Sequence, residues 1–279
     1  MIAVLRRLRD TAGKIRATEW LLLGIETLAV VVGILIAFEL EQWADDRREA
    51  REVDRTMREL LEEARYDVIH FDQAVRMFDS WIDDAKPHLE TLAEGGCPPA
   101  AGFEAIARME IFPPVEPPQS VYDELVAGKG LSSLPSSEAR IAVSIYQQQL
   151  AVMRSDRNNA TSGQRPETIV PADDPRLSLY PKPDNPNDFY DVTRIDYDAE
   201  ALCTDKGVRN RAVWIGGAQR IVNGWRKDAL GRAVNMCQAL GDVVGEPCFE
   251  NMPQSRIDET RAKELDAMGD KVRATYRER

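Results

Sequence analysis

WLLLGIETLAVVVGILIAF, residues Trp20–Phe38, decides the fold, because Glu26 is its only charged residue. As an α-helix rising about 1.5 Å per residue, this stretch matches the roughly 30 Å hydrocarbon core of a bilayer. Five basic residues precede it, as in a signal sequence, and no small-residue cleavage site follows it: Arg6, Arg7, Arg9, Lys14 and Arg16. We therefore predict a basic leader over residues 1–19 and a retained transmembrane helix over residues 20–38.

The orientation of this helix follows from the cysteines rather than from the charges. Five arginines also follow the span closely, so the basic residues on its two sides balance: Arg47, Arg48, Arg51, Arg55 and Arg58. Long domains, however, are translocated largely regardless of charge. All four cysteines lie beyond the span without a C-x-x-C motif, which favours disulfides in an oxidising compartment. We predict a cytoplasmic N-terminus and a periplasmic bulk.

The cysteines are Cys97, Cys203, Cys237 and Cys248. We favour a bond between Cys237 and Cys248, because the glycines and the proline between them let the chain turn. Cys97 would then pair with Cys203, but the other two connectivities remain open.

Charge argues against nucleic acid as a partner. The 279-residue chain has a formal net charge of -11, whereas nucleic-acid affinity comes mainly from Lys and Arg that neutralise phosphates. With 43% hydrophobic and 30% charged residues, the composition is typical of a helix-rich body with modest cores.

A long amphipathic helix is predicted directly after the span, over residues 39–94. Its apolar or small residues alternate in steps of four and three, the spacing of a coiled-coil-like seam. Pro87 should kink or interrupt this helix. The seam consists of Met57, Leu61, Ala64, Val68, Phe71, Val75, Phe78, Ile82, Ala85, Leu89 and Leu92.

Three further segments complete the predicted all-α fold. Residues 95–165 form a Pro-rich segment and a second helical segment, whose last helix has apolar positions Ile141, Ile145, Leu150 and Met153. Residues 166–204 are rich in Pro, Asp and Asn and predict an irregular connector. Residues 205–279 form C-terminal helices, the first with core positions Val208, Ala212, Ile215, Ala218, Val222, Trp225 and Ala229. We expect these helices to pack with the long one in an exported domain linked by disulfides.

Glu26 shares one helical face with small residues. At about 100° per residue, Gly33 and Ala37 lie within roughly 20° of Glu26, with Ala29 and Val30 beside them. Small residues let a second helix approach, and a buried carboxylate needs a partner, so this face predicts a helix–helix contact. Alternatively, Glu26 lies high in the leaflet and is either neutral or reaches towards the interface. Trp20 and Trp43 flank the span and are predicted interfacial anchors.

Motifs for catalysis, metals and cofactors are missing from the sequence. His70 and His88 have no metal-ligand spacing around them, and no nucleophile motif, P-loop or dinucleotide fingerprint occurs. Asp184–Asp188 offers oxygen ligands for calcium but lacks the Gly and distal Glu of the twelve-residue loop. We predict no catalytic, cofactor or metal site.

Two stretches resemble a large family of bacterial single-span proteins known only as a domain of unknown function. The family opens with G-E-x-x-x-V-x-x-G-I-L-I-A, followed by Trp-Asn-Glu. This chain resembles that opening at Glu26, at residues 32–37, VGILIA, and at Trp43, although Ala44 and Asp45 replace the last two residues. Residues 122–134 resemble its Y-x-E-L-x-x-x-G-x-L stretch. The resemblance covers about the first half of the chain and implies topology but no activity.

The sequence therefore predicts a non-enzymatic, structural or accessory subunit of a bacterial inner-membrane complex. Its expected partners are the lipid bilayer, other integral membrane proteins through the span, and envelope proteins or a second copy through the long helix. An envelope sensor or signalling ectodomain is one alternative, and an enzyme of unrecognised class is the other.

Overall fold

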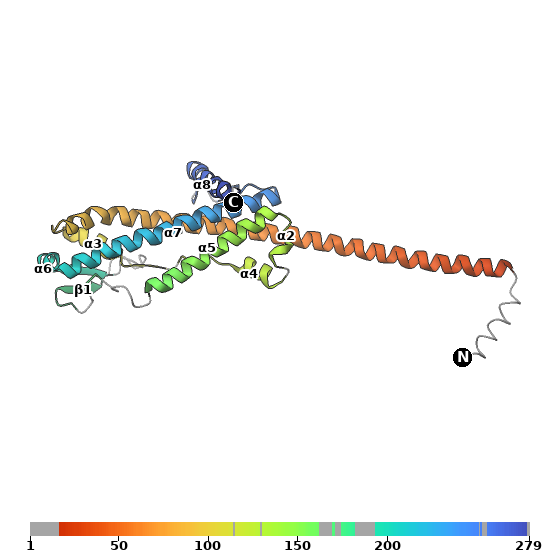
Figure 1. The fold of residues 1–279 in the computed structure, drawn as a ribbon, viewed down its shortest axis with the longest axis horizontal. Helices are drawn as coiled ribbons and strands as arrows, with labels where there is room; N and C mark the ends of the chain where they lie inside the picture. Colours follow the sequence, from red (N-terminus) through yellow and green to blue (C-terminus); the bar gives the residue numbers. More distant parts are fainter. Residues whose placement is uncertain are drawn as a thin grey trace, which may run out of the picture. The chain divides into compact units, whose positions relative to one another are not determined.

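A computed structural model describes residues 17–113, 115–128, 130–161, 169–170, 174–181, 193–250, 252 and 256–277. The chain divides into two compact units, Met1–Arg55 and Thr56–Arg279. As predicted, the fold is mainly helical, and the described residues add one two-stranded sheet (Figure 1).

Helix α2, Ala17–Ala93, contains both the predicted span and the predicted long helix. Its N-terminal part in the first unit is exposed from Gly24 onward except at Ala44 and Val53, which are partly buried, and the side chains before Gly24 lie outside the described residues. Among the described residues, no helix has the length and apolarity needed to cross a membrane. Pro87 does not end α2, because the helix continues to Ala93. Gly95, two residues after the end of α2, has a positive φ of 85°.

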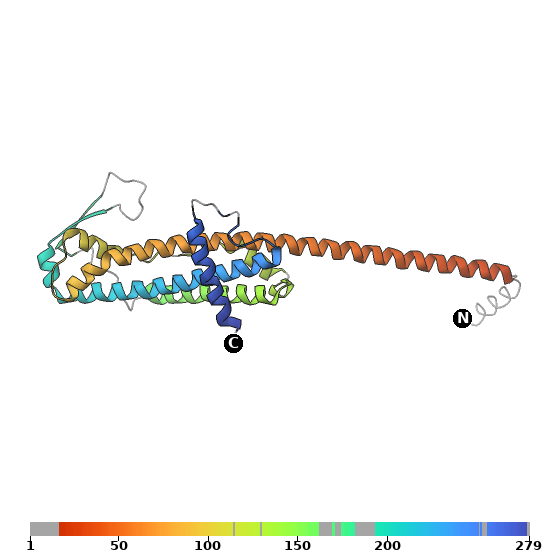
Figure 2. The ribbon, with the colours of Figure 1, turned by 90° about the horizontal axis from the view of Figure 1, so that it is seen from above.

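The seam on α2 forms one side of the core of the second unit, as predicted. Ten of its eleven residues are buried, and Ile82 is partly buried. Helix α7, Lys206–Val244, lies beside α2 and beside α5, Ser137–Thr161, in both views (Figures 1 and 2). Helix α8, Glu259–Arg277, packs across α7 (Figure 2).

Helix α5 follows the predicted core positions only in part: Leu150 is buried and Ile145 and Met153 are partly buried, but Ile141 is not. Ala142, Val143 and Tyr146 are buried, whereas Ile141 is exposed. Two short helices, α3, Ala100–Arg108, and α4, Ser120–Ala127, and the 3-10 turn η1, Leu131–Ser133, lie between α2 and α5 in the sequence.

The prediction of an irregular connector over residues 166–204 is wrong at residues 177–181 and 193–204, where the structure has two strands and a helix. Strands β1, Leu177–Pro181, and β2, Thr193–Tyr197, pair antiparallel from Leu177 opposite Tyr197 to Pro181 opposite Thr193. Helix α6, Ala199–Thr204, follows at once, because Asp198 caps it by accepting a bond from the Ala201 N–H.

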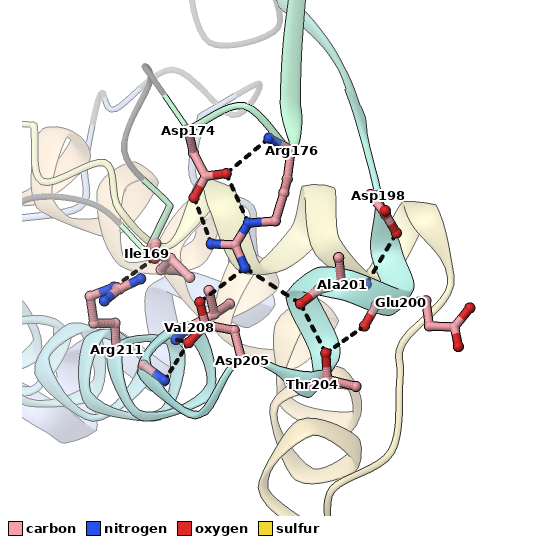
Figure 3. A network of polar contacts seen from close by, with 11 residues as sticks. Ile169, Asp174, Arg176, Asp198, Glu200, Ala201, Thr204, Asp205, Val208 and Arg211 are labelled. Atoms are coloured by element: carbon pink, nitrogen blue, oxygen red, sulfur yellow. Dashed lines mark hydrogen bonds and ion pairs between the residues drawn. The ribbon is translucent and has the colours of Figure 1, made fainter.

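An arginine ties this hairpin to the start of α7 (Figure 3). Arg176, next to β1, pairs with Asp174 at 2.6 Å and with Asp205 at 3.0 Å. Asp205 is the N-cap of α7 and accepts a bond of 2.7 Å from the Gly207 N–H. Arg211, one turn into α7, donates to the Ile169 carbonyl at 2.7 Å.

Two disulfides close the second unit. Cys237 pairs with Cys248 and Cys97 with Cys203, with Cα atoms 5.4 Å and 5.3 Å apart. The favoured connectivity is confirmed. The longer link joins the loop after α2 to α6 and so fixes the end of the connector.

Candidate functional site

The site with the clearest binding chemistry is a cavity between α5, α7 and the Pro-rich segment after α3. We call it the Arg226 pocket. Its volume is about 40 Å³. Three charged residues line it, Glu116, Arg154 and Arg226, and all its other walls are apolar: Phe112, Pro113, Val115, Pro117, Leu150, Met153, Val222 and Trp225.

A buried glutamine holds the Pro-rich wall against α7. The Gln219 amide nitrogen donates to the carbonyls of Met109, at 2.8 Å, and Ile111, at 2.7 Å, just before the wall begins. Gln219 is fully buried, so water cannot replace these bonds easily. The prolines that follow have fixed φ angles and no N–H donors, which makes the wall stiff.

Arg226 is buried to 2% exposure with its guanidinium carbon 3.5 Å from the centre of the Phe78 ring. Its Nη1 has no hydrogen-bond partner among the described residues. Burial lowers the pKa of Arg226 to about 10, so the side chain remains a cation at neutral pH.

The nearby acid on α2 is occupied by other groups. Asp79 accepts a bond of 2.8 Å from the Asn223 amide and lies 2.7 Å from the Lys227 ammonium. Arg226 thus has an aromatic neighbour on its face but no carboxylate partner in the described part of the chain.

A second polar cluster joins α2, α4 and α5. Asp67 is fully buried and accepts bonds from the Tyr146 hydroxyl at 2.8 Å and from the Gln119 amide at 3.3 Å. Burial raises the pKa of Asp67 to about 8, and the nearby Glu63 adds to the rise. One turn earlier, Glu63 caps α4 by accepting bonds from the Val121 and Tyr122 N–H groups. We regard this cluster as a structural link, because Asp67 is enclosed.

The raised pKa of Asp67 predicts a loss of stability with rising pH. An unfolded aspartate has a pKa near 3.9, so between about pH 4 and pH 8 the folded state binds a proton that the unfolded state does not. The stabilising effect is therefore full below about pH 4 and is lost as pH rises to about 8. Asp67→Asn should raise the free energy of unfolding at pH 7.5 by about 1 to 3 kcal/mol and flatten its pH dependence in urea denaturation.

Glu110 provides the comparison for this experiment. Burial raises its pKa to about 7, so it gives a slope of the same sign. The Asp67→Asn variant should keep the part of the pH dependence that Glu110 contributes to the free energy of unfolding. The double variant, Asp67→Asn with Glu110→Gln, should lose that part as well. An unchanged pH profile in both variants would contradict the prediction.

The residues of the predicted helix–helix contact belong to the first unit. Glu26, Ala29, Val30, Gly33 and Ala37 are all exposed on α2. A Cβ added at Gly33 would have no atom within 4 Å. Their role in a helix–helix contact stays a prediction.

Of the two predicted interfacial anchors, Trp20 and Trp43, the structure describes the side chain of Trp43. Trp43 is 56% exposed, and the Arg47 guanidinium lies 4.4 Å from its ring centre. The side chain of Trp20, most of the basic leader and the calcium candidate Asp184–Asp188 lie outside the described residues. Across the described parts of the chain, no three His, Cys, Asp or Glu side chains form a group suited to a metal ion.

Sequence reasoning missed the Arg226 pocket, although a signal was present. We assigned Val222 and Trp225 to the core, but both are only partly buried and line the pocket. The buried residues are Gln219, Asn223 and Arg226, a polar row with helical spacing on α7. A polar row inside an otherwise apolar helix face is the pattern that could have located the site.

Comparison of the chain with known protein families, with curated proteins and with solved structures yields no match.

Proposed function

We propose that the protein is a single-span accessory subunit of a bacterial inner-membrane complex and acts by protein–protein interaction rather than by catalysis. The first residues of α2 anchor it, and the second unit lies in the periplasm. The resemblance of the opening motif to a family of single-span proteins belongs to the same proposal.

The exposure of apolar side chains around α2 is the observation that carries this proposal. Leu28, Val30, Val31, Ile34 and Ile36 are between 47% and 63% exposed. At about 100° per residue they point to different sides of the helix. A helix that is apolar all round requires a lipid or protein environment, because its surface is unfavourable in water.

The disulfides support the periplasmic position of the second unit. All four cysteines are paired, and such bonds persist in oxidising compartments such as the periplasm. Arginines beside the span do not oppose this orientation, because long domains are translocated largely regardless of charge.

Gly33→Leu tests whether the span also binds a partner. The open space around Gly33 suits close approach of a second helix, and Glu26 on the same face can hydrogen-bond to it. We expect the variant to remain in the membrane fraction after alkaline washing but to lose co-purifying proteins, or self-association, severalfold. Glu26→Gln should lose less, because an amide still forms hydrogen bonds.

Leu28→Ala is the matched control, since Leu28 lies roughly 140° around the helix from Gly33. Equal recovery from Gly33→Leu and Leu28→Ala would mean that the span is only an anchor. Release of the unmodified chain from membranes by alkaline washing would overturn the proposal of a membrane anchor altogether.

A further inference from the structure

We propose that the Arg226 pocket is a binding site for a monocarboxylate, with the carboxylate paired to Arg226 and an apolar group against the walls. This ligand site goes beyond the accessory role proposed above and does not depend on it.

The arrangement around Arg226 selects the charge of the ligand. A buried guanidinium without a counterion is unfavourable, and one anionic group would compensate it. The nearby acids that the structure describes do not do so: Asp79 is engaged by Asn223 and Lys227. Glu116, on the pocket wall, has an exposed side chain. Of the three charged lining residues only Arg226 is buried, since Arg154 and Glu116 are exposed, and one buried cation suits a single negative charge rather than a strongly hydrated dianion.

The orientation of Arg226 selects the geometry of the anion. Phe78 covers one face of the guanidinium, at 3.5 Å, which leaves the N–H groups at its edge for in-plane partners. A planar carboxylate accepts two such N–H bonds side by side. Nη1 in particular is a buried donor without an acceptor in the described residues.

The size and the walls of the pocket select the rest of the molecule. A volume of about 40 Å³ admits a small head group and not an entire large ligand. The remainder must therefore lie along apolar lining side chains that are only partly buried, Trp225, Met153 and Val222. These side chains favour an aliphatic or aromatic group.

The test uses the full-length chain in detergent, with benzoate and hexanoate as probes and isothermal titration as the measurement. Benzamide has nearly the shape of benzoate but no charge, and acetate has the charge but little apolar surface. We expect saturable binding of one benzoate or hexanoate per chain and at least tenfold weaker binding of benzamide and acetate.

Arg226→Met should weaken benzoate binding at least tenfold, and this variant should fold, because an apolar side chain replaces an unpaired buried charge. Arg220→Met changes an exposed arginine on the same helix and should leave binding unchanged. Val222→Glu is an independent variant: it places a carboxylate one turn before Arg226 and should block benzoate without lowering the melting temperature.

Three results would each overturn the inference. One is the absence of saturable benzoate and hexanoate binding to the unmodified chain. Another is equal affinity for benzoate and benzamide, which would mean that the pocket recognises only apolar shape. The third is unchanged benzoate binding in both Arg226→Met and Val222→Glu, which would locate the bound probe elsewhere.

Discussion

Replacing Cys97 and Cys203 with alanine should lower the free energy of unfolding by about 4 to 5 kcal/mol, against about 3 kcal/mol for Cys237 and Cys248. The difference comes from the unfolded chain. The first disulfide joins residues 106 positions apart and the second joins residues 11 positions apart. A longer closed loop restricts the unfolded chain more, so its loss releases more entropy.

Denaturant unfolding of the oxidised protein and of the two double-alanine variants measures this difference. Alanine is preferred to serine because Cys203, Cys237 and Cys248 are buried, and a buried hydroxyl would add a penalty of its own. Reduction of both disulfides in the unmodified protein should lower its free energy of unfolding to that of a further variant in which alanine replaces all four cysteines. If loss of the short loop proves as costly as loss of the long one, chain entropy does not control the effect.

The seam of α2 could be predicted from the sequence because its alternation of apolar and polar residues is local and repeated. Each apolar step of three or four returns to the same side of the helix, and ten of the eleven residues are buried. The buried face of helix α5 was harder to predict, because this helix carries large apolar side chains on two faces. Ile141 and Val152 remain exposed while Ala142, Val143 and Tyr146 are buried, so periodicity placed Leu150 correctly but not Ile141.

The hairpin and the Arg226 pocket depend on partners that are distant in the sequence. Strand β1 is short and ends in a proline, and only its pairing with β2 makes it a strand. Arginine side chains are mostly exposed in proteins, whereas Arg226 is not. It is buried because Phe78 on α2 provides an aromatic face for it, at 3.5 Å, and no local pattern on α7 reveals that ring.

Loss of Arg261 should be nearly as damaging as loss of the long disulfide. Asp72 on α2 is fully buried, and Arg261 on α8 donates to its Oδ1 through Nε at 2.8 Å and Nη2 at 2.6 Å. Arg76 Nη2 lies 3.0 Å from the other oxygen, but Oδ2 has no hydrogen bond of good geometry in the described residues. Arg261→Met would leave this buried carboxylate with the half-exposed Arg76 alone, and we expect a loss of about 3 to 5 kcal/mol.

Lys263→Met is the matched control, two positions along the same helix. Lys263 and Glu259 form an ion pair of 2.8 Å, but their side chains are 74% and 86% exposed, and exposed helix pairs contribute only about 0.3 to 0.5 kcal/mol. A double variant, Asp72→Leu with Arg261→Met, should recover most of the loss, because removing both charges also removes the burial penalty. Denaturant unfolding measures the free energies, and hydrogen exchange along α8 shows whether the helix detaches. Equal effects of Arg261→Met and Lys263→Met would mean that apolar packing of α8 on α7, rather than the buried ion pair with α2, holds this helix in place.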